Sequence, residues 1–215
     1  MTKSWIFDFD GTLVHSAPQI MQAYKEVTKI IAPERLIYTK SIKIGPTLDE
    51  TIKHILGGTY SSLYKDFEVE FKVLYDSKYI FKTVPYKNSE EVLRFLKKNG
   101  GNLAIATNKR TIPTIALIEQ YGWMKYFDRV ECVDASKKYK SNKAVLLNSL
   151  IKEKPQYKEA YYIGDTANDG KAANINNLKF IKANYGYGTE DCWKNIQVYS
   201  KIEDIYNLKE MQKKQ

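Results

Sequence analysis

An apolar run that ends in two acids and a glycine constrains the fold more than any other stretch of this 215-residue chain. Residues 5–7 read Trp-Ile-Phe, and they are followed by Asp8, Asp10 and Gly11. A short apolar run of this kind predicts a strand that is buried on both faces, as in a parallel sheet. Gly11 allows a sharp turn after the strand. We therefore expect both carboxylates at the carboxyl edge of the sheet, where open α/β folds bind ligands.

Asp8 and Asp10 have two explanations at this point. Two acids two positions apart in an extended segment point in the same direction, so both could reach one cation or one reacting centre. Acids are also common in turns that end a strand. The pattern Asp-x-Asp-Gly alone leaves both explanations open, and later segments are needed to separate them.

Apolar runs and helical patterns alternate through the second half of the chain. Strands are predicted near residues 102–107, 129–133, 160–165 and 178–184, and helices near 112–121, 141–152, 168–175 and 201–210. Repeated β-α alternation predicts a parallel sheet with helices on both faces, joined by right-handed crossovers. The sequence therefore indicates an α/β fold.

Residues 16–82 interrupt this alternation with three helical segments. Their apolar residues recur at helical spacing, as Tyr24 and Val27 do in the first segment. We expect a helical subdomain over 16–82, inserted into a core that consists of residues 1–15 and 83–215.

Three later segments add chemistry to the first strand. Thr107 and Asn108 follow an apolar run, and Lys143 opens a predicted helix. A second buried strand ends in Gly-Asp-Thr-Ala-Asn-Asp, which supplies Asp165 and Asp169. The motifs Asp-x-Asp-Gly-Thr-Leu, Thr, Lys and Gly-Asp-x-x-x-Asp occur in the order typical of the haloacid dehalogenase superfamily. Over nearly its whole length the chain resembles that superfamily, and its layout is most similar to the phosphoglycolate-phosphatase-like branch.

The resemblance implies a Rossmann-like parallel sheet of order 5-4-1-2-3 and a C1-type helical cap over residues 16–82. It assigns Asp8 as a nucleophile that forms an aspartyl-phosphate. It assigns Asp10 as the acid that protonates the leaving alcohol and as the base that then activates water. Thr107 and the backbone N–H of Asn108 would bind phosphoryl oxygens at a helix start.

The same resemblance implies a Mg²⁺ cofactor, because a carboxylate and a phosphate dianion repel each other and Mg²⁺ binds both through oxygen. The expected ligands are Asp8, the backbone carbonyl of Asp10, and Asp165. Asp169 would bind the metal through water or orient its ligands. Lys143 would place a positive charge beside the phosphoryl oxygens.

Further substrate contacts are expected in two loops. Gly11 and Thr12 belong to the nucleophile loop. The family's cap presents the loop between its first two helices to the active site, and here that loop contains Gly45 and Thr47. His15 stands just beyond the nucleophile loop, where close relatives often have an aspartate. This difference alters either the hinge or a substrate contact, and the sequence leaves the choice open.

More than one lysine could bind the phosphate. Lys143 directly precedes the apolar stripe of the predicted helix, which Ser141 is expected to cap, whereas relatives with another motif favour the longer spacing of Lys140. A cation in the first turn of a helix is unfavourable by about 0.3–1 kcal/mol. A lysine in the first turn is better explained by binding of an anion than by stabilisation of the helix. We therefore expect Lys143 to bind the phosphate, with Lys140 as the alternative.

Composition argues against several other classes of protein. No apolar run approaches the roughly 18–20 residues of a membrane helix. The first strand begins too early for a signal peptide, so a cytoplasmic location is expected. Cys132 and Cys192 do not make a disulfide framework. The net charge is +9, from 34 Lys+Arg and 25 Asp+Glu, but the lysines are dispersed and no nucleic-acid-binding motif is present. Neither a membrane nor a nucleic acid is expected as a partner.

We therefore predict a Mg²⁺-dependent phosphatase of small phosphorylated metabolites, either phosphoglycolate-like compounds or phosphosugars, that is a monomer or a homodimer. Three alternatives remain open. A phosphosugar mutase would return the phosphate to a sugar. A nucleotide or nucleic-acid-end phosphatase would fit the basic charge. A non-catalytic regulatory protein could keep the fold without the activity.

Overall fold

The computed structural model describes residues 3–136, 142–188 and 192–213. The chain forms two compact units, which we call the core unit (Met1–His15 with Pro85–Gln215) and the helical unit (Ser16–Val84). The chain leaves the core unit after strand β2 (Val14–His15) and returns to it through strand β3 (Val84–Pro85). None of the helices in the described part of the chain has both the length and the apolar character that a membrane crossing needs.

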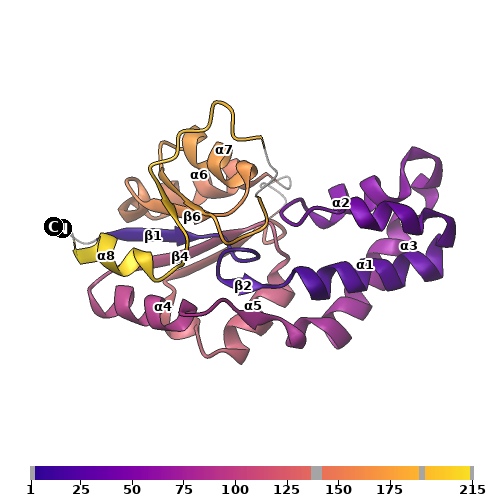
Figure 1. The fold of residues 1–215 in the computed structure, drawn as a ribbon, viewed down its shortest axis with the longest axis horizontal. Coiled ribbons are helices and arrows are strands. Elements are labelled where there is room, and N and C mark those ends of the chain that lie inside the picture. Colours follow the sequence, from indigo (N-terminus) through magenta and orange to yellow (C-terminus); the bar gives the residue numbers. More distant parts are fainter. Residues whose placement is uncertain (1–2, 137–141, 189–191, 214–215) are drawn as a thin grey trace. The chain divides into compact units, whose positions relative to one another are not determined.

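A parallel sheet forms the centre of the core unit (Figure 1). Its strands in the described residues are, in spatial order, β5 (Arg129–Cys132), β4 (Asn102–Thr107), β1 (Ser4–Phe7), β6 (Tyr161–Gly164), β7 (Lys179–Ala183) and β8 (Ser200–Ile202). Read from the β8 edge and numbered along the chain, this order is 6-5-4-1-2-3. The predicted order 5-4-1-2-3 is confirmed, and a sixth strand extends one edge of the sheet.

The sixth strand shows that the prediction of a helix near 201–210 was wrong in its first half. Residues Ser200–Ile202 pair in parallel with β7, and helix α8 begins only at Asn207 and ends at Lys213. Ile202 is buried, whereas Lys201 beside it is exposed. This alternation is too short to identify from the sequence, because pairing with a neighbouring strand outweighs a weak local preference.

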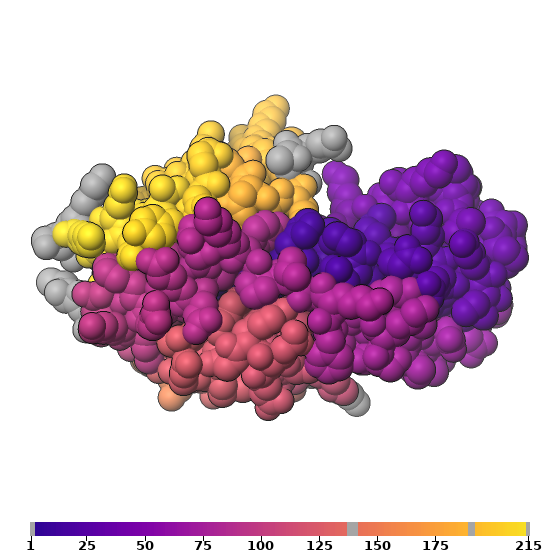
Figure 2. Space-filling model, turned by 60° about the horizontal axis from the view of Figure 1, so that its bottom comes forward, coloured from indigo at the N-terminus to yellow at the C-terminus, as the bar shows by residue number. Residues whose placement is uncertain are grey.

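Helices cover both faces of the sheet (Figure 1). Helices α4 (Ser89–Lys98) and α5 (Thr111–Gln120) lie on one face, and α6 (Lys143–Glu153) and α7 (Ala167–Ile175) lie on the other. Helix α8 packs beside α4, where the Lys209 ammonium lies 2.7 Å from the Glu91 carboxylate. Figure 2 shows this arrangement from outside, with the yellow C-terminal residues against magenta residues of the α4 region.

Strand β1 is buried on both faces, as its apolar run predicted. Trp5, Ile6 and Phe7 are all 0% exposed. Ile6 belongs to the apolar cluster under α6 and α7, which also contains Ala104, Leu146, Leu147, Leu150, Tyr162 and Phe180. Side chains alternate along a strand, so Trp5 and Phe7 project to the opposite face. The strand that carries the two acids is therefore fixed by packing from both sides.

The register of β1 aligns the strand ends that carry the predicted site residues. Phe7 pairs with Ile105 of β4 and with Ile163 of β6. All three strands run in the same direction, so the residues that follow them emerge at the same edge of the sheet. This alignment places the first acidic pair, the Thr107 loop and the second acidic pair next to one another.

The helical unit consists of α1 (Ala17–Ile31), α2 (Leu48–Leu56) and α3 (Tyr64–Leu74), together with shorter helical segments at Pro33–Ser41, Gly58–Leu63, Tyr75–Tyr79 and Ile80–Lys82. The predicted apolar stripes form its core. Tyr24 and Val27 are buried with residues of the other two helices, and the ring of Tyr24 stacks on that of Phe71 with 4.2 Å between centroids. The side chain of Thr47 caps α2 by accepting a hydrogen bond from the Glu50 backbone N–H.

Two isoleucines on α5 give a test of the core packing. Ile118 is 0% exposed and Ile112 is 68% exposed. Ile118→Ala should lower the free energy of unfolding by about 2–5 kcal/mol, because it removes buried methyl groups and leaves a cavity. Ile112→Ala should change it by no more than about 0.5 kcal/mol. Urea denaturation followed by circular dichroism measures both, and equal effects of the two variants would contradict the packing described for this helix.

Candidate active site

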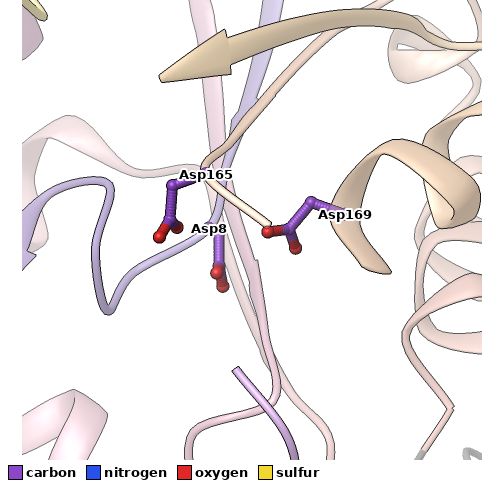
Figure 3. A group of neighbouring side chains, drawn as sticks. All are labelled: Asp8, Asp165 and Asp169. Atoms are coloured by element: carbon purple, nitrogen blue, oxygen red, sulfur yellow. The ribbon is translucent and has the colours of Figure 1, made fainter. Parts of the chain in front are cut away.

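Three buried carboxylates lie together at the carboxyl edge of the core sheet. Asp8 follows β1, Asp165 follows β6, and Asp169 lies in the first turn of α7. Figure 3 shows Asp8 between the other two, and one oxygen atom from each side chain lies within 4.8 Å of the others. Asp165 and Asp169 are 0% exposed and Asp8 is 3% exposed. Convergent carboxylate oxygens are suitable ligands for a hard divalent cation.

Lys143 is the cation of this cluster. Its ammonium lies 3.0 Å from Oδ1 of Asp8 and 2.5 Å from Oδ1 of Asp169, and its side chain is 1% exposed. Burial alone lowers the pKa of Lys143, but the charges of Asp169 and Asp8 outweigh burial and hold this pKa above its usual value. Lys143 is the first residue of α6, as expected. The residue that caps the helix is Asn142, whose side chain accepts from two backbone N–H groups, and the expected cap, Ser141, lies outside the described residues.

Negative charge exceeds positive charge within this cluster. Burial raises the pKa of Asp8 to about 7, and Asp169 adds to the effect while Lys143 opposes it. Burial, followed by the charges of Asp169 and Asp8, raises the pKa of Asp165 well above its usual value. Among the described residues, one ammonium faces three carboxylates when all three are ionised, and a divalent cation would balance the remaining charge. The donor set fits Mg²⁺ in both atom type and charge.

Asp169 uses both of its oxygens within the protein. Oδ1 accepts from the ammonium of Lys143 and from the Tyr162 hydroxyl, which is 3.2 Å away. Oδ2 accepts from the backbone N–H of Thr166 at 2.9 Å and from the Thr166 hydroxyl at 2.6 Å. Because protein groups engage both oxygens, these contacts favour the orienting role over the alternative, which is binding of the metal through water. Tyr162, which was not predicted as a site residue, shares its one hydroxyl proton between Asp169 and the backbone carbonyl oxygen of Ala106, which is 3.1 Å away.

Asp165 is held by two loops. The Thr12 hydroxyl donates to its Oδ1 at 3.1 Å, and the backbone N–H of Tyr187 donates to its Oδ2 at 2.7 Å. Gly11 has a φ of +84°, and a Cβ atom there would lie 2.2 Å from Oδ2 of Asp165. Gly11 and Thr12, predicted as substrate contacts, thus shape the surroundings of this carboxylate.

Asp10 points to a different cation. Each of its carboxylate oxygens lies 3.1 Å from the ammonium of Lys109, and the Lys109 side chain is only 5% exposed. Lys109 was not among the predicted site residues, although it directly follows the predicted phosphate-binding pair Thr107 and Asn108. Loops after neighbouring parallel strands meet at one edge, and this rule would have identified a lysine in that loop as a partner for the first acidic pair.

Thr107 ends β4 and is buried. Its hydroxyl oxygen accepts from the backbone N–H of Lys109 at 3.2 Å. The expectation of a helix start at this residue was wrong, because α5 begins at Thr111 and its cap position is Arg110. Residues 108–110 separate the strand from the helix, so Thr107 and Asn108 directly precede Lys109, the residue whose ammonium contacts Asp10.

The two predicted cap contacts lie in the helical unit. Gly45 has a φ of +119°. The Thr47 hydroxyl donates to the Glu50 carboxylate at 2.8 Å and is thereby engaged in the capping of α2. Contact of either residue with a substrate stays a prediction. Lys140, the alternative phosphate-binding lysine, lies outside the described residues.

Comparison with known proteins gives one family match. The model of the haloacid dehalogenase-like hydrolase family matches residues 5–183. A phosphoglycolate phosphatase from Nitrosococcus oceani is 27% identical over 212 residues, which cover 96% of this chain and 94% of that protein. A phosphoglycolate phosphatase from Nitrosospira multiformis is 27% identical over 191 residues, which cover 86% of this chain and 84% of that protein.

Solved structures show the same fold. A predicted phosphatase from Clostridium acetobutylicum superposes with a TM-score of 0.81 at 24% identity, and the match covers 98% of each chain. A haloacid dehalogenase-like hydrolase from Streptococcus pneumoniae superposes with a TM-score of 0.80 at 20% identity, covering 96% of each chain.

The raised pKa of Asp165 predicts how the free energy of unfolding depends on pH when a chelator keeps the protein free of metal. Asp165 has a raised pKa in the folded state and a pKa of about 3.9 in the unfolded state. The parent protein should therefore lose stability as the pH rises from about 4 towards the folded pKa. Asp165→Asn has no carboxyl group to ionise at this position. Its free energy of unfolding minus that of the parent should therefore be larger at pH 8 than at pH 4.

Urea denaturation of metal-free protein at the two pH values measures this difference. Asp49→Asn serves as a control because Asp49 is an exposed acid on α2, and this change should leave the pH dependence as it is in the parent. An Asp165→Asn variant that is no more stable than the parent at pH 8 would contradict the prediction.

Proposed function

The chain belongs to the haloacid dehalogenase-like hydrolase family and is a phosphoric monoester hydrolase, and on this premise we propose that it hydrolyses small phosphorylated metabolites with Asp8 as the nucleophile. One observation carries the proposal. Asp8 is buried at the end of β1, 3.0 Å from the Lys143 ammonium and beside Asp165. The relatives from Nitrosococcus oceani and Nitrosospira multiformis are phosphoglycolate phosphatases, which supports a small phosphate ester of that kind as substrate.

Asp8 would carry the first chemical step. An oxygen of its carboxylate attacks phosphorus, the bond from phosphorus to the alcohol oxygen breaks, and an aspartyl-phosphate forms. Lys143 lies where it can balance charge on Asp8 and on the transferred phosphoryl group. Because phosphoryl transfer depends mainly on positioning and charge stabilisation, these buried, oppositely charged groups are the principal support for the mechanism.

Asp10 would move the protons. It gives a proton to the oxygen of the leaving alcohol in the first step. In the second step it takes a proton from the water that attacks phosphorus, while the bond from phosphorus to the Asp8 oxygen breaks and inorganic phosphate leaves. Both of its carboxylate oxygens contact the ammonium of Lys109, and this ion pair would orient the carboxylate for proton transfer. Thr107 and the backbone N–H of Asn108 are the proposed donors to the phosphoryl oxygens.

Mg²⁺ is the proposed cofactor. When bound, it would supply the positive charge that offsets the repulsion between the buried carboxylates and the phosphate dianion. Asp8, Asp165 and the backbone carbonyl of Asp10 are the proposed ligands, and Asp169 orients Lys143 through the contact described above. The charge excess of the carboxylate cluster supports this assignment.

The helical unit is the proposed cap. Residues 16–82 would select the substrate, with Gly45 and Thr47 in the loop that faces the active site in other members of the family. The proposed role of this unit in substrate specificity is taken from the position of the cap in other members of the family.

A screen of phosphorylated metabolites tests the proposed function. With Mg²⁺ present, the protein should release inorganic phosphate from small esters such as phosphoglycolate or phosphosugars, and excess chelator should abolish the release. Ca²⁺ should substitute poorly, because it takes more ligands at longer distances. An isomeric phosphosugar product without phosphate release would indicate a mutase, and full activity in chelator would contradict the mechanism.

Two substitutions distinguish the nucleophile from the acid–base. Asp8→Asn should abolish turnover and leave no phosphorylated protein, because an amide is a poor nucleophile. Asp10→Asn should lower turnover by roughly 10²–10⁴-fold but still become phosphorylated by an ester with a good leaving group. Mass spectrometry of acid-quenched protein detects the phosphoryl group. Phosphorylation of Asp8→Asn would remove Asp8 from its proposed role.

Two lysine substitutions test which side chain binds the phosphate. Lys143→Ala should lower turnover by at least about 10²-fold, by analogy with the loss of one charge-stabilising group. Lys140→Ala is the matched comparison and should lower turnover by less than about tenfold. Steady-state kinetics with the best substrate of the screen measures both. The reverse ranking would move the role to Lys140, and two small effects would mean that neither lysine contacts the transferred group.

A further inference from the structure

His15 contacts the hydroxyl groups of two tyrosines. Its Nδ1 atom lies 3.2 Å from the Tyr187 hydroxyl and 3.5 Å from the Tyr86 hydroxyl. The imidazole ring also packs against both phenol rings, with centroid distances of 5.8 and 5.7 Å. In the tautomer that carries its proton on Nε2, the Nδ1 atom accepts a hydrogen bond from the Tyr187 hydroxyl. We call these three residues the His15 cluster.

The His15 cluster joins three separate parts of the core unit. His15 is the last residue before the chain enters the helical unit, and Tyr86 is the second residue after it returns. Tyr187 lies in the loop that follows β7. The cluster therefore ties both crossing segments to a loop that is distant from them in the sequence.

That loop reaches Asp165 through its backbone. The N–H of Tyr187 donates to Oδ2 of Asp165. On either side of Tyr187, a Cβ atom at Gly186 would lie 2.2 Å from Cβ of Asp165, and one at Gly188 would lie 2.2 Å from the Asp165 backbone oxygen. The close approach thus requires glycine on both sides. Because these neighbours have no side chain, Tyr187 is the residue of this Gly-Tyr-Gly segment that can anchor the peptide.

A second contact closes a ring around Asp165. The Tyr185 hydroxyl donates to the backbone oxygen of Thr12 at 2.9 Å, and the Thr12 hydroxyl donates to Oδ1 of Asp165. The Tyr185 ring also packs edge-on against Tyr86 at 4.9 Å. Each oxygen of Asp165 is therefore held by a different loop, and the two loops are joined to each other through tyrosine side chains.

We propose that the His15 cluster is a positioning device for Asp165, which holds the N–H of Tyr187 on this carboxylate and so sets the affinity of the carboxylate cluster for Mg²⁺. The inference rests on the proposed function only in taking Asp165 as a Mg²⁺ ligand. His15, Tyr86 and Tyr187 act through Asp165 and are positioning residues. Metal ligands are commonly oriented by the groups around them, and loss of such a group typically weakens metal binding.

Three variants separate this role from a general contribution to stability. Tyr187→Phe keeps the ring and the backbone N–H but loses the hydroxyl. His15→Ala removes the acceptor. His15→Asn restores it, since the amide oxygen of asparagine can accept the hydrogen bond that Nδ1 accepts. His54→Ala is the control, because His54 is the other histidine of the chain and contacts Ser41 in the helical unit.

Two measurements are made without substrate. Hydrogen exchange by NMR reports whether the Tyr187 amide remains bonded to Asp165, and titration calorimetry gives the Kd for Mg²⁺. Tyr187→Phe and His15→Ala should speed exchange at this amide and raise the Kd by about 3–10-fold, as expected for one lost hydrogen bond. His15→Asn and His54→Ala should stay within about twofold of the parent. The double variant Tyr187→Phe/His15→Ala should be no worse than Tyr187→Phe alone, because the phenylalanine already lacks the hydroxyl that His15 contacts.

Several outcomes would overturn the inference. Unchanged Mg²⁺ affinity in Tyr187→Phe and His15→Ala would limit the cluster to a structural role, even if urea denaturation showed lower stability. Failure of His15→Asn to restore the affinity of His15→Ala would also overturn it, as would a parent protein that binds no Mg²⁺. A parent that binds Mg²⁺ with the expected variant effects, but hydrolyses no phosphate ester, would leave this inference standing and overturn the proposed function alone.

Discussion

The excess of buried negative charge at the end of the sheet governs the arrangement of the core unit around it. Burying a carboxylate is unfavourable unless a cation or hydrogen-bond donors surround it. The ammonium of Lys143 forms ion pairs with Asp8 and Asp169. The hydroxyl of Thr12 and the N–H of Tyr187 donate hydrogen bonds to Asp165. The loops and helix starts that carry these groups are thus held in place by the requirement to accommodate the carboxylates. Among the described residues the carboxylates of the cluster still outnumber its ammonium group, which leaves negative charge for a divalent cation to balance.

The sequence predicted the central part of this arrangement because its signals are local. Each strand that carries a site residue is an apolar run that ends abruptly in polar residues, and parallel pairing brings such ends together without further information. Asp8 and Asp165 were therefore identifiable before the structure, whereas the choice of Lys143 and the strand order 5-4-1-2-3 came from the resemblance to the haloacid dehalogenase superfamily. The helical stripes of residues 16–82 were equally local, and Tyr24 and Phe71 lie in the core of that unit.

The features that the sequence did not predict depend on contacts between distant segments. Strand β8 is three residues long and exists through its pairing with β7. Lys109 became a site residue only when its pairing with Asp10 was seen. The His15 cluster joins residues more than 170 positions apart, since the separation of His15 and Tyr187 is 172. Patterns of polarity along the chain contain no information about the His15 cluster, because each of its members is compatible with an ordinary loop.

The glycines around Asp165 have a consequence for how this protein could change over evolution. A side chain at Gly11, Gly186 or Gly188 would lie 2.2 Å from an atom of Asp165. These three positions are therefore closed to substitution as long as Asp165 is in place, whatever the substrate. Substitutions that create a new substrate preference therefore have to arise elsewhere in the chain. A mutant library aimed at new substrates should leave these three glycines unchanged.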